Sequence, residues 1–194
     1  MAEPVRGPRH ELYEAFLNVP AHRCAEIVNG TLHVLPRPSP RHANASSMLG
    51  GALSGPFQGG RGGPGGWWIL DEPELHLVEL EAVVPDLAGW RVERMPDLPE
   101  EAFFTLPPDW VCEVLSRSTE RLDREEKLPL YADHGVRHAW LVDPVAQTLE
   151  VYALGERGRW REIRHHRGDE RVRAAPFDAI ELALSDLWSP PVRR

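Results

Sequence analysis

The spacing of hydrophobic positions predicts both strands and helices in the first third of the chain. Residues 23–35 alternate apolar and polar positions on either side of an Asn-Gly dipeptide, which is typical of a hairpin with a two-residue turn. Residues 8–18 and about 41–57 repeat apolar positions every three or four residues, which predicts amphipathic helices. Six of the eight residues in 59–66 are glycines, so we expect a flexible loop there.

The rest of the chain predicts a sheet with one crossover helix. The segments expected as strands are 67–70, 75–80, 82–90, 110–115 and 138–143, and further antiparallel strands are expected within 148–188. A helix is expected at about 119–134, between the last two of the named strands. Such a crossover makes its two strands parallel and adjacent. The predicted fold class is therefore α/β: a mixed β-sheet flanked by helices, with additional antiparallel hairpins.

Length and composition favour one globular domain. A chain of 194 residues is long enough for one core and short for two, so we expect residues 1–194 to form a single domain with a disordered tail at 189–194. No apolar run approaches the ~20 residues that span a bilayer. The first residues lack the apolar stretch of a secretion signal. The two cysteines lie in apolar runs without CxxC spacing, as free thiols in a reducing compartment do. We expect a cytoplasmic protein with no membrane association.

The charge pattern singles out one residue. The net charge of −8 argues against bulk electrostatic coating of nucleic acid, although it leaves room for a local basic groove. Among the 22 cationic side chains, Lys127 is the single lysine and all the others are arginine. Arginine keeps its proton, whereas the pKa of lysine responds to its surroundings. Lys127 is therefore a candidate for chemistry.

Two otherwise apolar strands each carry one carboxylate. Asp86 lies in the segment VVPDLA, and Glu113 lies in WVCEVL. A carboxylate in a covered sheet costs several kcal/mol unless it is paired, hydrogen-bonded or metal-bound. Two such acids held together would bind a divalent cation, and oxygen ligands without a Cys/His cluster favour Mg²⁺ or Mn²⁺. The alternative for either acid alone is a strand-end residue that is partly hydrated or paired with an arginine.

Lys127 shares a predicted helix face with Asp123 and Tyr131, at spacings of four residues. One interpretation is an exposed Asp–Lys pair that contributes about 0.5 kcal/mol or less. The other is that the helix folds back across the sheet and brings Lys127 to the two strand acids. Pro129 is expected to distort this helix, because it removes a backbone hydrogen bond.

The order of several short motifs resembles a known family. They are Glu26-Ile-Val-Asn-Gly30, Pro38-Ser-Pro-x-His42, Glu72-Pro-Glu74, Val-Pro-Asp86, Glu113-Val-Leu-Ser, Asp123-x-x-x-Lys127 with Tyr131, and Gly135-Val-x-x-x-Trp140-Leu-Val-Asp-Pro. Together they resemble the bacterial Uma-two family of restriction-type endonucleases, within the PD-(D/E)xK nuclease superfamily. The likeness covers about residues 10–188. Each motif is common alone, and their joint order is specific.

The resemblance implies a restriction-endonuclease-like fold and roles for particular residues. Asp86 and Glu113 would be the metal-binding acids, assisted by the carbonyl of Val114. The superfamily usually places its lysine two residues after the second acid, where this chain has Leu115. Lys127 resembles the migrated lysine of the family.

Three further residues are candidates for supporting the site. Glu26, His42 and Glu74 lie in matching motifs. A hairpin ion pair, a helix N-terminal residue and a solvated loop acid, respectively, are equally good interpretations.

These features together predict an Mg²⁺- or Mn²⁺-dependent endonuclease that hydrolyses phosphodiester bonds, with DNA as the expected substrate. Cutting both strands of a duplex would require two sites, so a homodimer is a further hypothesis. Two other functions stay open: an inactive nucleic-acid-binding module on the same fold, and a metal-dependent hydrolase of a smaller phosphoester. The arginine-rich segment 156–173 would either follow a phosphate backbone or form the solvated face of a hairpin.

Overall fold

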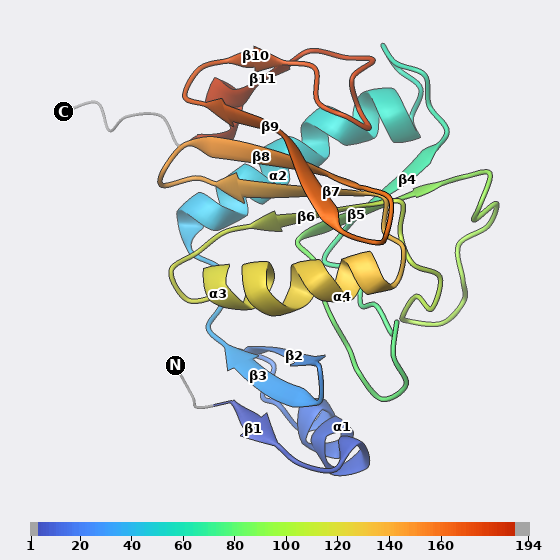
Figure 1. Cartoon of the computed structure of the whole chain (residues 1–194), viewed down its shortest axis with the longest axis vertical. Helices are drawn as coiled ribbons and strands as arrows, with labels where there is room; N and C mark the ends of the chain where they lie inside the picture. The colour runs from blue at the N-terminus through green and yellow to red at the C-terminus, as the bar shows by residue number, and fades with distance from the viewer. Residues whose placement is uncertain (1–3, 189–194) are drawn as a thin grey trace.

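A computed structural model describes residues 4–188, so the predicted tail at 189–194 lies outside the described residues. Figure 1 shows a central sheet with helices on both faces and a smaller N-terminal unit at one end. That unit consists of α1 and a three-stranded sheet. The mixed α/β fold predicted from the sequence is confirmed, with the crossover helix between two central strands.

The central sheet has six strands in chain order, each paired with the next. They are β4 (Trp67–Asp71), β5 (Leu87–Arg91), β6 (Trp110–Val114), β7 (His138–Asp143), β8 (Thr148–Leu154) and β9 (Trp160–Arg167). Strands β6 and β7 are parallel, as the crossover predicts, and the other neighbours are antiparallel. Shorter C-terminal elements follow: β10 (Arg171–Val172), β11 (Leu182–Ala183) and the 3-10 turn η3 (Leu184–Leu187).

Helices cover both faces of this sheet (Figure 1). The sheet separates the hydrophobic core into two clusters, one under the helices of each face. On one face lies α2 (Pro40–Leu53), extended by the π-helical turn η1 (Ser54–Gln58). Its apolar side packs on Trp110, Cys112 and Val114 of β6. On the other face lies a helix made of α3 (Glu120–Leu122), the π-helical turn η2 (Asp123–Lys127) and α4 (Leu128–Asp133). Val111 of β6 contributes to that second core, so Glu113 faces the same side.

The π-helical turn η2 ends just before Pro129. Proline removes one i→i−4 hydrogen bond and crowds the preceding turn. A π-turn widens the helix locally and is a common way to absorb such a disturbance. The distortion expected from Pro129 is therefore present, and it falls on the turn that carries Lys127.

The N-terminal unit consists of β1 (Val5–Arg6), α1 (Arg9–Leu17) and the hairpin β2 (Cys24–Val28) and β3 (Thr31–Leu35). The predicted hairpin is confirmed. Asn29 and Gly30 both have positive φ, at 50° and 68°, as a type I′ turn requires. Their backbone N–H groups donate to the buried carboxylate of Glu81, at 3.0 and 2.9 Å. This contact ties the hairpin to the main body.

Two strand predictions were wrong. Residues 75–80 form no strand, because Leu75 makes only isolated bridges, to Val83 and Phe104, and Leu80 turns the chain with φ of +59°. The strand predicted at 82–90 begins at Leu87 instead, since Pro85 cannot donate to a sheet ladder. The segment before β5 is therefore a turn that places Asp86 at the beginning of β5.

The glycine-rich loop 59–66 folds back on η1. The N–H of Gly65 donates to the carbonyl of Pro56 at 2.9 Å. A Cβ at Gly63 would lie 2.4 Å from Cβ of Pro56, so glycine is required there by close approach. The flexibility of this loop stays a prediction.

Within residues 4–188, no helix combines the length and hydrophobicity that crossing a bilayer demands. Cys24 and Cys112 are both free thiols, as expected.

Candidate active site

Asp86 stands directly before β5, at the edge where β6 ends. Its Oδ2 accepts a hydrogen bond from the N–H of Val114 at 2.6 Å, and its Oδ1 lies 3.2 Å from Nε2 of His42. The side chain is 16% exposed. Both oxygens therefore have partners, and one of them is the backbone of the strand that carries the second acid.

Glu113 is buried on the helix-covered face of β6, with 2% of its side chain exposed. The hydroxyl of Tyr131 donates to its Oε1 at 2.6 Å. The ammonium of Lys127 lies 3.0 Å from the same oxygen and 3.1 Å from Oε2. The apolar strand predicted that Glu113 is buried, and this is confirmed. Its partner is the ammonium of Lys127 rather than an arginine.

Lys127 is also 2% exposed and points into the protein. Besides Glu113, its Nζ lies 3.0 Å from Oε2 of Glu26, 3.0 Å from the carbonyl of Val84 and 3.8 Å from Oδ1 of Asp123. An exposed Asp–Lys pair is thereby ruled out. The lysine joins the helix, the central sheet and the N-terminal hairpin.

Of the three supporting candidates, Glu26 and His42 lie at the site and Glu74 does not. Glu26 accepts from the N–H of Val84 at 3.0 Å in addition to binding Lys127. Glu74 instead pairs with His76 at 2.6 Å and lies outside the pocket. Glu72, which has φ of +44°, lines the pocket in its place.

Burial and charge shift the pKa values of the cluster in a consistent way. Burial raises the pKa of Glu113 well above its usual range, even though Lys127 opposes the shift. Burial likewise raises the pKa of Asp123 to about 7. Burial alone would lower the pKa of Lys127, but Glu113, Glu26 and Asp123 together raise it well above its usual range. The lysine is therefore charged. The positive charge around Glu113 and Asp123 is too small to offset the effect of burial on their pKa values.

His42 shows the same electrostatic imbalance. Burial lowers its pKa, but the hydrogen bond to Asp86 and the acids around it outweigh burial, so the pKa is raised. Its Nδ1 is buried and has no hydrogen-bond partner. A positive charge at this end of the site is thus favoured.

The donor set fits a hard divalent cation in its chemistry. Five carboxylates, those of Glu26, Glu72, Asp86, Glu113 and Asp123, line the same pocket as the single ammonium of Lys127. All the anionic donors are oxygen, which Mg²⁺ and Mn²⁺ prefer. In the arrangement seen here, no three His, Cys, Asp or Glu side chains within residues 4–188 are grouped as a metal site. The carboxylates are turned toward protein donors instead.

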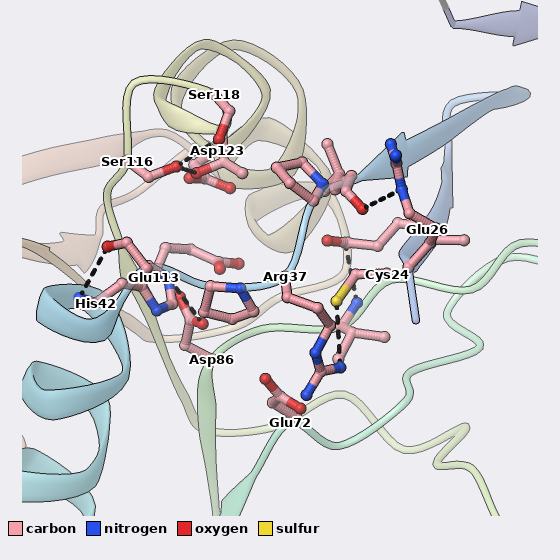
Figure 2. Close-up of a pocket in the computed structure, with 18 of the residues that line it drawn as sticks. Cys24, Glu26, Arg37, His42, Glu72, Asp86, Glu113, Ser116, Ser118 and Asp123 are labelled. Atoms are coloured by element: carbon pink, nitrogen blue, oxygen red, sulfur yellow. Dashed lines mark hydrogen bonds and ion pairs between the residues drawn. The ribbon is translucent and has the colours of Figure 1, made fainter. Parts of the chain in front are cut away.

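These residues line one pocket of about 370 Å³ between the N-terminal hairpin and the central sheet. In Figure 2, Glu26, Cys24 and Arg37 lie on one side of it, His42 on the opposite side, and Ser116, Ser118 and Asp123 along a third.

Two parts of this pocket were not predicted from the sequence as site residues. One is the pair Arg23 and Arg37, and the other is the hydroxyl group cluster Ser116, Ser118 and Thr119. The three hydroxyls directly follow the strand of Glu113 and begin the next helix, which is the signal that could have found them. Nothing in the sequence marks Arg23 and Arg37 among so many arginines.

A mixed sheet bearing two strand acids, with a helix lysine facing them across one pocket, defines a restriction-endonuclease-like α/β protein. The chain belongs to the Uma2 family, described as "Putative restriction endonuclease", whose model matches residues 11–185. It is also similar to a crystal structure described as a putative nuclease belonging to DUF820 from Anabaena variabilis. The TM-score is 0.71 at 21% identity, over 91% of this chain and 96% of that one, which establishes the fold. Comparison with curated proteins finds no match.

Proposed function

We propose that this protein is an Mg²⁺- or Mn²⁺-dependent endonuclease that hydrolyses phosphodiester bonds in DNA. One observation carries the proposal: Asp86, Glu113 and Lys127 line one pocket, with Lys127 in direct contact with Glu113. Membership of a family described as restriction endonucleases supports a nucleic-acid substrate. Burying the ionisable side chains of Glu113 and Lys127 is costly, and catalysis is a common reason for which proteins retain such groups.

Asp86, Glu113 and the carbonyl of Val114 would hold the cation. When bound, a divalent cation supplies polarisation of the phosphate and a more acidic water. Lys127 would place its charge on the oxygens of the phosphate as negative charge develops there. Tyr131 and Glu26 hold Glu113 and Lys127 in position through the contacts of 2.6 and 3.0 Å. His42 orients Asp86, since its Nε2 lies 3.2 Å from the carboxylate.

An inactive binding module is the weaker alternative. A site without turnover has no need of carboxylates whose pKa values are raised by burial, because apolar residues of similar volume would be at least as stable. Hydrolysis of a smaller phosphoester is favoured by one observation, the pocket volume of about 370 Å³, which lies near the lower end for small-ligand sites.

A plasmid-nicking assay tests the proposal. The wild type is expected to nick supercoiled DNA with Mg²⁺ or Mn²⁺ and not with EDTA. Asp86→Ala and Lys127→Arg are expected to lose at least about a hundredfold in rate, the usual effect of removing a group that stabilises transition-state charge.

Arg121→Lys is the matched control, because Arg121 lies on the same helix and is 88% exposed. It should keep the wild-type rate. Full activity in EDTA, or a wild-type rate in Lys127→Arg, would contradict the proposed site.

A homodimer stays a prediction. It follows only if the substrate is a duplex that must be cut on both strands, since each chain carries one such pocket.

A further inference from the structure

Two of the catalytic candidates are almost fully buried where they line the pocket. Glu113 and Lys127 are each 2% exposed, and both line the pocket described above. The hairpin β2–β3 and the linker 36–39 cover the site from one side, as Figure 2 shows for Cys24 and Arg37. Glu26 fixes this cover in place through its contacts with Lys127 and the backbone of Val84. A phosphate must therefore enter beneath the hairpin to reach the acids.

The rim of the pocket carries groups that bind phosphate. Arg37 is exposed, and its guanidinium has one weak contact, with Sγ of Cys24 at 3.5 Å. Across the pocket, Ser116 Oγ lies 3.0 Å from the hydroxyls of both Ser118 and Thr119. A free guanidinium and several hydroxyls are typical partners of a nucleic-acid backbone. Within residues 4–188, no aromatic side chain other than His42 lines the pocket, so the described part of the pocket offers no surface on which bases could stack.

The surface around the pocket is poorly suited to a duplex. The net charge is −8, and some arginines are paired with acids, including Arg9 with Glu81 and Arg94 with Asp109. The arginine-rich strand β9 lies three strands away from β6 in the order of the sheet. A duplex bound over this pocket would therefore lie away from the arginine-rich strand.

We propose that the pocket admits one strand at a time, and that the substrate is single-stranded DNA or the unpaired end of a duplex. Arg37 would bind the phosphate next to the one that is cut. This inference rests on the proposed function and narrows its substrate class. It also removes the need for a homodimer, because one site is enough to cut one strand.

The test compares three labelled DNAs of the same sequence: a single strand, a blunt duplex and a duplex with an unpaired tail. Cleavage is measured in Mn²⁺, and binding is measured by fluorescence anisotropy in Ca²⁺ at several salt concentrations. The single strand and the tail should be cut, and the single strand bound, about tenfold better than the blunt duplex, the difference that one charge-assisted hydrogen bond produces.

Arg37→Ala should weaken binding of the single strand about tenfold and reduce the slope of log affinity against log salt by about 0.7, the value for one phosphate of a single strand. Arg159→Ala is the matched control, because Arg159 is exposed at the β8–β9 turn, away from this pocket. It should change neither quantity.

Two outcomes would overturn the inference: a blunt duplex bound and cut as well as the single strand, or an unchanged salt slope in Arg37→Ala. In the first case the proposed function would still stand. If no DNA is cut with any metal, the proposed function fails, and the binding ranking still decides which form of DNA the pocket accepts.

Discussion

Lys127 carries its charge in a place with almost no water. Its ammonium is 2% exposed and is held by Glu26, Glu113 and the carbonyl of Val84. A planar guanidinium could not direct its donors to all three positions from one point. The retention of a single lysine in an arginine-rich chain is explained by this geometry.

Lys127→Met is therefore expected to destabilise the fold by about 3–5 kcal/mol, because it leaves buried carboxylates without their counter-charge. Urea unfolding monitored by tryptophan fluorescence measures this. The double variant Lys127→Met/Glu113→Gln should recover part of the loss. Arg121→Met, at an exposed position of the same helix, should leave stability close to that of wild type. Equal losses in Lys127→Met and Arg121→Met would refute the description of Lys127 as a buried ion-pair centre.

Residue chemistry alone singled out the three residues that we propose as the core of the site. A single acid in each of two apolar strands and a single lysine were visible in the sequence, and the structure places Asp86, Glu113 and Lys127 around one pocket. Glu74 could not be excluded from the sequence, because its position depends on the backbone turn at Glu72. A positive φ at a glutamate has no sequence signature.

At the scale of elements, the helix α3–η2–α4 is fixed to the sheet at two points. Lys127 and Tyr131 bind Glu113 on β6. One turn earlier, Arg124 makes two hydrogen bonds to Glu150 on β8, at 2.8 and 2.6 Å. The two contacts set both the position and the rotation of the helix that carries the lysine.

The contact between Arg124 and Glu150 should make the stability of the protein depend on pH. The hydrogen bonds from Arg124 hold the pKa of Glu150 below its usual range. A lowered pKa in the folded state means that the contact stabilises above the unfolded pKa and is lost as pH falls through the folded value. Glu150→Gln should therefore lower stability by about 1–3 kcal/mol at pH 7. The difference from wild type should shrink below about pH 4.

Chemical unfolding of both proteins at pH 7, 5 and 3.5 measures this difference. Glu120→Gln is the control, because Glu120 also contacts Arg124 but is half exposed. A difference between Glu150→Gln and wild type that persists unchanged at pH 3.5 would show that the ionised pair is not its cause.

The element predictions failed where the chain departs from regular periods. The hairpin, the crossover and the parallel pair β6–β7 followed from local patterns and from the rules of chain connection. The segment 72–86 did not, because its apolar residues pack in turns and isolated bridges rather than along a ladder. Tertiary contacts such as that of Glu81 with the hairpin hold it, and these lie about fifty residues apart in the chain.

At the scale of the whole molecule, the site lies where three separate units meet: the N-terminal hairpin, the central sheet and the crossover helix (Figure 1). Glu26, Glu113 and Lys127 come one from each. The arginine-rich strand β9 lies at the far edge of the sheet and has exposed charged side chains, which is how proteins protect an open sheet edge. This favours the solvated-hairpin interpretation of 156–173 over phosphate tracking.

The proposed function requires that the charge of Asp86 enables this pocket to cut DNA with a divalent cation. Asp86→Asn tests it most directly, because the amide oxygen can still accept the hydrogen bond from Val114. The decisive measurement is the rate of cleavage of labelled DNA in Mn²⁺ by wild type and Asp86→Asn, with equal thermal stability checked first. We predict cleavage by the wild type and a loss of at least about a hundredfold in the variant. Equal rates in two equally folded proteins would contradict the account.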